Sequence, residues 1–175
     1  MMNTDKNKQI GMYIHIPFCI RKCKYCDFVS EAASDFVHEN YINALIDEIN
    51  GYDAGQLEGY GLRSVFIGGG TPSAVKAEYI SRIMTAVKEH FADICGHLTE
   101  ITIECNPGTV TAENLRIYRD AGINRLSFGL QSAIDSELKC IGRIHTWDDF
   151  KNSYRLAHEA GFENVNVDLM FDLPD

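Results

Sequence analysis

Runs rich in β-branched and aromatic residues alternate with segments of helical periodicity along most of the chain, and this alternation constrains the fold most strongly. Five runs have the character of short strands: residues 12–16, 64–67, 100–104, 125–129 and 165–169. Apolar residues between them recur at helical spacing, and the segment Thr146-Trp-Asp-Asp149, an N-cap with an acidic first turn, predicts the start of a helix that ends near Gly161. Strands separated by helices pair in parallel through right-handed crossovers, so we expect an α/β open sheet or barrel.

Glycines and polar residues follow the expected strands at the ends where α/β folds bind ligands. A cysteine-rich segment follows the first strand, residues 68–71 follow the second, Glu104 ends the third and Gln131 follows the fourth. The segment Gly-Gly-Gly-Thr at 68–71 matches neither a P-loop nor a dinucleotide fingerprint. Its glycines either bring the backbone close to a ligand or simply form a tight turn.

Three cysteines, Cys19, Cys23 and Cys26, lie within eight residues after the first strand. This spacing directs three thiolates from a single loop towards one point, and thiolates are ligands of soft metals and iron–sulfur clusters. Three ligands leave one metal position open, which indicates an exchangeable ligand and therefore chemistry. The alternative is a zinc site completed by His15 or His145. The basic residues within the same loop either offset the charge of a cluster or are solvated.

Composition limits the other classes of function. The formal charge of −9 argues against a nucleic-acid-binding surface. No stretch approaches the roughly 18 apolar residues of a transmembrane helix, and the first residues are polar rather than a signal peptide. Cys95, Cys105 and Cys140 show no framework spacing, so we expect reduced thiols in a cytoplasmic protein.

The pattern Cys-x3-Cys-x2-Cys, with Tyr25 before the last cysteine, resembles the radical S-adenosylmethionine (SAM) superfamily. Six segments in order narrow this resemblance to the oxygen-independent coproporphyrinogen III oxidase family: Tyr13-Ile-His-Ile-Pro-Phe-Cys19, Gly68-Gly-Gly-Thr-Pro72, Glu104-Cys-Asn-Pro-Gly108, Leu126-Ser-Phe-Gly-Leu-Gln-Ser132, Gly142-Arg-Ile-His145 and Asn166-Val-Asp-Leu-Met170. The resemblance extends from about Met12 to the last residue.

The chain departs from the oxidase branch of this family in two features. That branch carries a further cysteine two residues after the third, where this chain has Phe28, and it has a long N-terminal extension before the cysteines. Both differences resemble the haem-chaperone branch, which we favour. The alternatives are the oxidase, which would convert coproporphyrinogen III to protoporphyrinogen IX, and a zinc-binding interaction module.

The resemblance implies a six-unit (βα)6 radical-SAM barrel. Because the chain ends just after the fifth strand, we expect a partial barrel: a polar segment at residues 1–11, an incomplete core domain at 12–175, and no C-terminal domain. In the family, that C-terminal domain contributes substrate or haem contacts. Haem would therefore bind in the full-length protein.

The resemblance also implies the cofactors and their contacts. Cys19, Cys23 and Cys26 would hold one [4Fe–4S] cluster, whose fourth iron binds SAM. The positions that match SAM contacts are Tyr13, Tyr25, Gly69, Gly70, Thr71, Glu104, Gln131, Arg143 and Asp168. No catalytic residue is assigned. The expected partners are haem or a porphyrinogen, an electron donor for the cluster and a haem acceptor protein of unknown identity.

Overall fold

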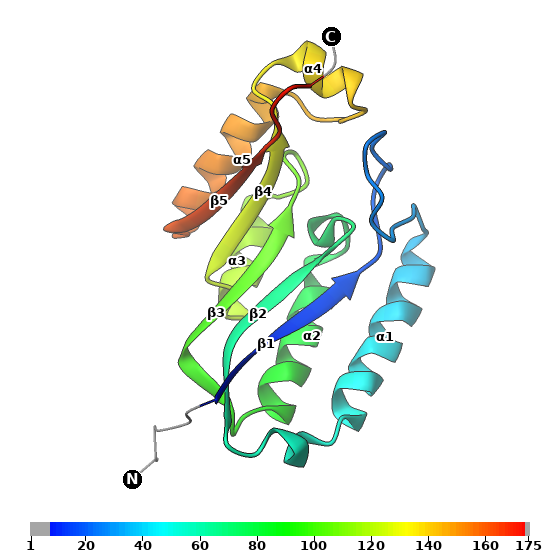
Figure 1. Cartoon of the computed structure of the whole chain (residues 1–175). Coiled ribbons are helices and arrows are strands. Elements are labelled where there is room, and N and C mark those ends of the chain that lie inside the picture. Colours follow the sequence, from blue (N-terminus) through cyan, green and yellow to red (C-terminus); the bar gives the residue numbers. More distant parts are fainter. Residues whose placement is uncertain (1–7, 174–175) are drawn as a thin grey trace.

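Five parallel strands form one sheet in the order β1-β2-β3-β4-β5 in the computed structural model, which describes residues 8–173 except for the side chains at positions 97 and 98 (Figure 1). The strands are β1 (Lys8–Ile16), β2 (Tyr60–Gly69), β3 (Cys95–Cys105), β4 (Arg125–Gln131) and β5 (Asn164–Leu169). The helices are α1 (Asp35–Gly51), α2 (Ala77–His90), α3 (Ala112–Asp120), α4 (Asp135–Cys140) and α5 (Trp147–Glu159), with short 3-10 segments η1 (Ala54–Leu57) and η2 (Pro72–Ala74). The predicted parallel α/β architecture is confirmed.

One face of the sheet is covered by helices and the other is not (Figure 1). Because side chains alternate along a strand, the covered face takes every second residue. Ile14 and Ile16 of β1 and Val65 and Ile67 of β2 are all buried against the helical layer. The opposite face is polar towards β5, where the Asn166 side-chain amide donates to Ser127 Oγ at 3.0 Å. An open polar face of this kind can receive a ligand.

The helix predicted after Thr146 is present as α5. The Thr146 hydroxyl accepts from the Asp149 backbone N–H, and the Asp149 carboxylate accepts from the Thr146 N–H, which completes a capping box. The helix ends at Glu159, just before Gly161 at φ +83°. This boundary was therefore set by local chemistry that is visible in the sequence.

Strand pairing extends several strands beyond their predicted limits. β1 begins at Lys8 rather than residue 12, because Lys8 pairs with Tyr60 of β2. Part of the expected polar segment at 1–11 is therefore strand, while residues 1–7 and 174–175 lie outside the described residues. None of the helices in the described part of the chain is long and apolar enough to cross a membrane.

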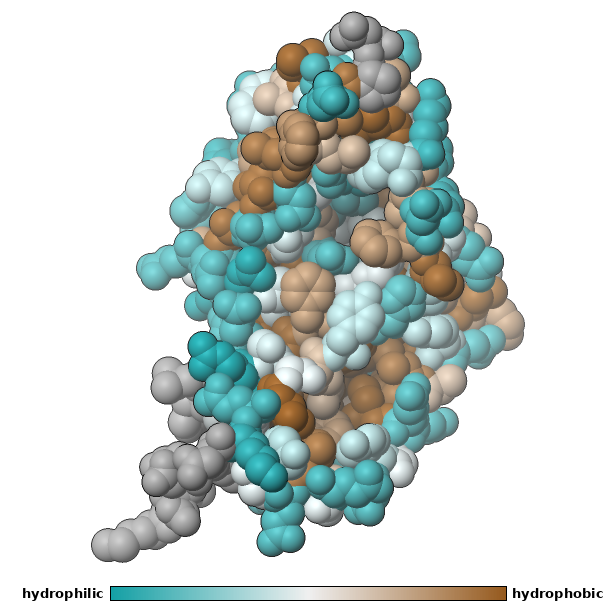
Figure 2. Space-filling view, viewed as in Figure 1, coloured by the Kyte–Doolittle hydropathy of each residue, from teal (hydrophilic) through white to brown (hydrophobic). Residues whose placement is uncertain are grey.

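Apolar surface is exposed along the β5 side of the sheet (Figure 2). Within residues 8–173, β5 pairs with β4 alone. Leu169 at its end is 66% exposed, and Phe171 just beyond it is 94% exposed. An edge strand with exposed apolar side chains favours association with another chain.

Candidate functional site

A cavity of about 330 Å³ lies at the carboxyl ends of the strands, between the cysteine loop and the sheet. It brings together all but one of the residues predicted to hold the cluster and SAM. These are Cys19, Cys23, Tyr25, Cys26, Gly69, Gly70, Thr71, Glu104, Gln131, Arg143 and Asp168. Their convergence from positions up to 149 residues apart (168 − 19) supports one shared site.

Backbone hydrogen bonds close the base of the cysteine loop. The Cys19 N–H donates to the Glu31 carbonyl, and the Glu31 N–H donates to the Pro17 carbonyl, both at 2.9 Å. Farther out, the Lys24 N–H donates to the Ile141 carbonyl at 3.0 Å. The loop is thus held at its base and against the segment before Arg143, with all three thiols free and half-buried.

The glycine-rich turn after β2 packs directly on the strand end that precedes Cys19. The Gly70 N–H donates to the Ile16 carbonyl at 2.9 Å, and the Thr71 N–H donates to the Phe18 carbonyl at 2.7 Å. A Cβ on Gly70 would lie 2.6 Å from the Phe18 carbonyl oxygen. Gly70 is therefore required for the close approach of this turn to the Phe18 backbone, and the same turn lines the cavity. That its glycines also admit a ligand stays a prediction.

Glu104 lies at the end of β3 with its carboxylate against the same turn. Its Oε2 accepts a hydrogen bond from the Gly69 N–H at 3.0 Å. Burial raises the pKa of the Glu104 carboxyl, the Gly69 bond partly opposes this, and the nearby Asp168 carboxylate raises the pKa further. A half-buried carboxylate in this environment would gain from a cationic ligand.

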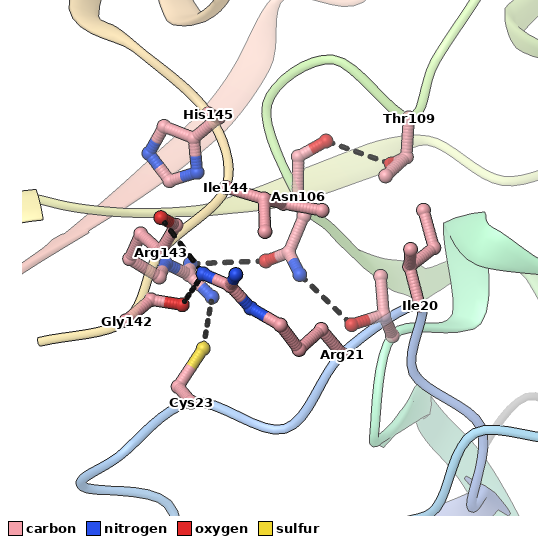
Figure 3. Close-up of a pocket in the computed structure, with 10 residues that line it drawn as sticks. Ile20, Arg21, Cys23, Asn106, Thr109, Gly142, Arg143, Ile144 and His145 are labelled. Carbon is pink, nitrogen blue, oxygen red and sulfur yellow. Dashed lines mark hydrogen bonds between the residues drawn. The ribbon is translucent and has the colours of Figure 1, made fainter. Parts of the chain in front are cut away.

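Arg143 extends from the loop after α4 towards Cys23 (Figure 3). Its Nη1 donates to Cys23 Sγ at 3.6 Å, and its Nη2 donates to Asn106 Oδ1 at 3.0 Å and to the Gly129 carbonyl. Its Nε is buried without a hydrogen-bond partner among the described residues. A cation with a spare donor beside three thiols suits a negatively charged, thiolate-bound group.

Two contributors to the site were not assigned from the sequence. Asn106 links Arg143 to the Gly-rich turn, and the only signal for it was its place in the Glu-Cys-Asn-Pro-Gly segment after β3. Arg21 was expected either to offset charge or to be solvated. Instead its Nη2 donates to the carbonyls of Gly142 and Arg143, at 2.6 and 3.3 Å, and so fastens the cysteine loop to the Arg143 loop.

Tyr13 is the predicted contact that the cavity does not include. Its side chain is 59% exposed, stacks on Phe66 and donates its hydroxyl proton to His15 Nδ1 at 3.0 Å. His15 Nε2 in turn donates to the Val29 carbonyl at 3.0 Å. Tyr13 thus reaches the cysteine loop through His15, which lies on the same face of β1 and two residues closer to the loop.

Both histidines considered as zinc ligands already have hydrogen-bond partners. His15 uses both ring nitrogens, and His145 Nε2 donates to the Leu130 carbonyl at 3.2 Å. Burial and the nearby Arg143 cation lower the pKa of His145 to about 4. Among residues 8–173, no group of three or more His, Cys, Asp or Glu side chains is arranged to hold a single metal ion.

The three other cysteines are free thiols in the structure. Cys105 is buried, and burial raises the pKa of its thiol to about 12, so it stays protonated although it borders the cavity. Cys95 begins β3 and Cys140 ends α4, both outside the lining of the cavity.

Comparison with known proteins places these features in a family. A family profile described as the radical SAM superfamily matches residues 13–175. The chain is 39% identical to heme chaperone HemW of Escherichia coli over 95% of its length, and 42% identical to that of Bacillus subtilis over 93%. It spans 43% and 42% of those two chaperones.

A solved structure shares the same architecture. Coproporphyrinogen III oxidase (HemN) from Escherichia coli superposes with a TM-score of 0.84 at 30% identity, covering 95% of this chain and 38% of the oxidase. A more distant structure shares the fold: the FeFe-hydrogenase maturase HydG from Carboxydothermus hydrogenoformans superposes with a TM-score of 0.61 at 16% identity, covering 97% of this chain and 38% of that chain. With its three-cysteine loop at the mouth of a parallel α/β sheet, this chain belongs to the radical SAM superfamily.

Proposed function

We propose that Cys19, Cys23 and Cys26 hold one [4Fe–4S] cluster in the 330 Å³ cavity and that SAM binds beside it. Radical SAM proteins use these two cofactors. Three free thiols on one loop, facing a cavity beside the Arg143 cation, fit a thiolate-bound cluster. When bound, the reduced cluster supplies one-electron reduction of SAM, from which a carbon radical able to abstract hydrogen is formed.

The strand ends supply the polar contacts for SAM in this proposal. The Glu104 carboxylate lies beside the Gly69 N–H and would accept hydrogen bonds from the SAM ammonium group. Gln131 and Asp168 line the same cavity and would face the ribose or amino acid part. Tyr25, which is 39% exposed, would pack near the adenine. Tyr13 would act only indirectly, by holding His15 against the cysteine loop.

For the whole protein we infer a role in haem metabolism, with haem handed to an acceptor protein. The support is the sequence identity of about 40% to curated heme chaperones and the presence of Phe28, which is 69% exposed at the cavity, where the oxidase branch has a cysteine. The cofactor-binding part is residues 12–175. A cytoplasmic location and an electron donor for the cluster belong to the same proposal.

The second candidate function is oxidative decarboxylation of coproporphyrinogen III. Its support is the TM-score of 0.84 to a solved coproporphyrinogen III oxidase at 30% identity. The two candidates differ in what they require of a porphyrin. A chaperone binds haem and releases it unchanged, whereas the oxidase removes two carboxyl groups from its substrate.

Metal analysis after anaerobic reconstitution tests the cluster. We expect about four irons per chain, lost when Cys19, Cys23 or Cys26 is replaced by alanine. Replacing Cys95 or Cys140 by alanine provides matched controls that should keep the iron. Stoichiometric zinc without iron would instead establish the zinc-binding module.

The two porphyrin functions are separated on a protein as long as the curated relatives. Haem titration followed by absorbance should show saturable binding and transfer to an acceptor, and a decarboxylation assay with coproporphyrinogen III and SAM should show no turnover. Turnover without stable haem binding would favour the oxidase.

A further inference from the structure

A continuous chain of side-chain hydrogen bonds connects two of the three cysteine sulfurs. From one end, Cys19 Sγ lies 3.6 Å from Thr71 Oγ1, and Asn106 Nδ2 donates to Thr71 Oγ1 at 2.8 Å. From the other end, Arg143 Nη1 donates to Cys23 Sγ at 3.6 Å, and Arg143 Nη2 donates to Asn106 Oδ1 at 3.0 Å. Asn106 therefore lies at the centre of a link between Cys19 and Cys23, and Figure 3 shows its part from Cys23 through Arg143 to Asn106.

The direction of the hydrogen bonds in this chain is fixed by Asn106. An amide side chain donates through its nitrogen and accepts through its oxygen. Because Asn106 donates to the Thr71 oxygen, the Thr71 hydroxyl proton is free to point at Cys19. Because Asn106 accepts from Arg143 Nη2, the guanidinium is turned so that Nη1 points at Cys23. Both ends of the chain thus direct a donor at a sulfur atom.

The surrounding structure holds this series of hydrogen bonds in place and leaves the positive charge of Arg143 unpaired by any acid among the described residues. Thr71 is only 4% exposed. The Arg143 backbone carbonyl is held by Arg21, and the Arg143 guanidinium also donates to the Gly129 carbonyl. In the described part of the chain, no carboxylate forms an ion pair with Arg143. Its positive charge is therefore directed at Cys23 rather than neutralised by an acid.

We propose that Thr71 and Asn106 are positioning residues that set the reduction potential of the cluster by directing donors at the Cys19 and Cys23 sulfurs. Hydrogen bonds and positive charge at thiolate ligands stabilise the reduced, more negative cluster and raise its potential. This rests on the proposed cluster site. The chain delivers the donors from β3, from the Gly-rich turn and from the loop after α4, so the potential depends on how these segments pack.

The test is an EPR-monitored redox titration of reconstituted protein carrying Thr71→Val, Thr71→Ser or Asn106→Asp. Thr71→Val removes the hydroxyl at nearly constant volume, and Thr71→Ser keeps it. In Asn106→Asp the carboxylate accepts from both neighbours, so the Thr71 proton turns away from Cys19. Thr102→Val is the matched control, because Thr102 is equally buried on β3 but bonds Arg125 instead.

We expect Thr71→Val and Asn106→Asp each to shift the equilibrium between reduced and oxidised cluster about tenfold towards the oxidised form. This corresponds to a reduction potential lower by about 59 mV for a one-electron couple. Thr71→Ser and Thr102→Val should leave the potential unchanged. The double variant Thr71→Val/Asn106→Asp should shift it by less than the sum, because both changes break one chain.

Unchanged potentials in Thr71→Val and Asn106→Asp would overturn the proposal. If Thr71→Val folds normally but fails to load iron while Thr71→Ser loads it, the hydroxyl is needed for cluster assembly, and the potential of Asn106→Asp decides the proposal. If neither Thr71→Val nor Thr71→Ser loads iron, cluster loading depends on side-chain packing at position 71 and not on the hydroxyl, and the proposal is refuted. Absence of a cluster in the unmodified protein would instead refute the proposed function on which this inference depends.

Discussion

Replacing Gly70 by alanine tests whether close packing of two backbones holds the cysteine loop. The new Cβ would lie 2.6 Å from the Phe18 carbonyl oxygen and 2.9 Å from the Phe18 carbonyl carbon and nitrogen. These are backbone atoms, so no flexible side chain can yield. The clash is removed only if the end of β1 and the turn move apart. This movement would weaken the backbone hydrogen bonds from Gly70 to Ile16 and from Thr71 to Phe18.

The expected loss follows from these contacts. Overpacking typically costs about 1–3 kcal/mol, and one weakened backbone hydrogen bond adds about 1 kcal/mol. We therefore expect Gly70→Ala to lower the free energy of unfolding by about 2–4 kcal/mol. Since Cys19 directly follows Phe18, the iron content after reconstitution should fall as well.

Urea unfolding followed by circular dichroism measures the free energy of unfolding, and iron content after reconstitution reports whether the cysteine loop is correctly positioned. The matched control is Gly51→Ala at the end of α1, where nothing lies within 4 Å of the added Cβ and helix propensity should increase stability by up to about 1 kcal/mol. A Gly70→Ala protein as stable as the parent, with full iron, would refute the claim that this close approach positions the cysteines.

Three further outcomes are expected. As the pH is lowered, SAM affinity measured by calorimetry should begin to fall at a higher pH than an ordinary glutamate would cause, because the raised pKa of Glu104 means that its carboxylate is protonated at a higher pH. Glu104→Gln should abolish this pH dependence and weaken SAM binding by about 1–3 kcal/mol. Burial and the Arg143 cation lower the His145 pKa from 6.5 to about 4, against weaker opposing effects of the Leu130 hydrogen bond, Asp149 and Asp135. The free energy of unfolding should therefore fall by up to about 1.4 kcal/mol per pH unit as the pH drops from 6.5 to about 4, and His145→Gln should flatten this pH profile. An unchanged slope in the variant would contradict the assignment. Light scattering should show self-association that Leu169→Lys reduces, since Leu169 is exposed at the β5 edge; a monomeric parent protein would contradict this.

The sequence predicted those features that depend on residues close together in the chain. Alternating strand and helix patterns indicated parallel pairing, and the Thr146 cap correctly placed the start of α5. The spacing of Cys19, Cys23 and Cys26 placed three thiols on one loop. Each of these signals is local, because periodicity and capping depend on backbone geometry over a few residues.

Sequence patterns were less informative where an element is short or where pairing with a neighbouring strand extends it. Helix α4 was not predicted, because its six residues include a single buried apolar side chain, Leu138, and show no periodicity. β3 starts at Cys95 rather than residue 100, since pairing of Cys95 with Leu62 across a register shift extends the strand. Such limits are set by the partner strand.

Only the tertiary structure decided how the site is assembled. Arg143 reaches Cys23 across 120 positions of sequence, and Asn106 lies between Arg143 and Thr71, because the ends of three neighbouring strands and the loop after α4 meet at one edge of the sheet. Tyr13, part of the same motif as Cys19, instead faces His15 and lies outside the cavity. A motif specifies which residues are present, whereas packing determines which atoms of those residues meet.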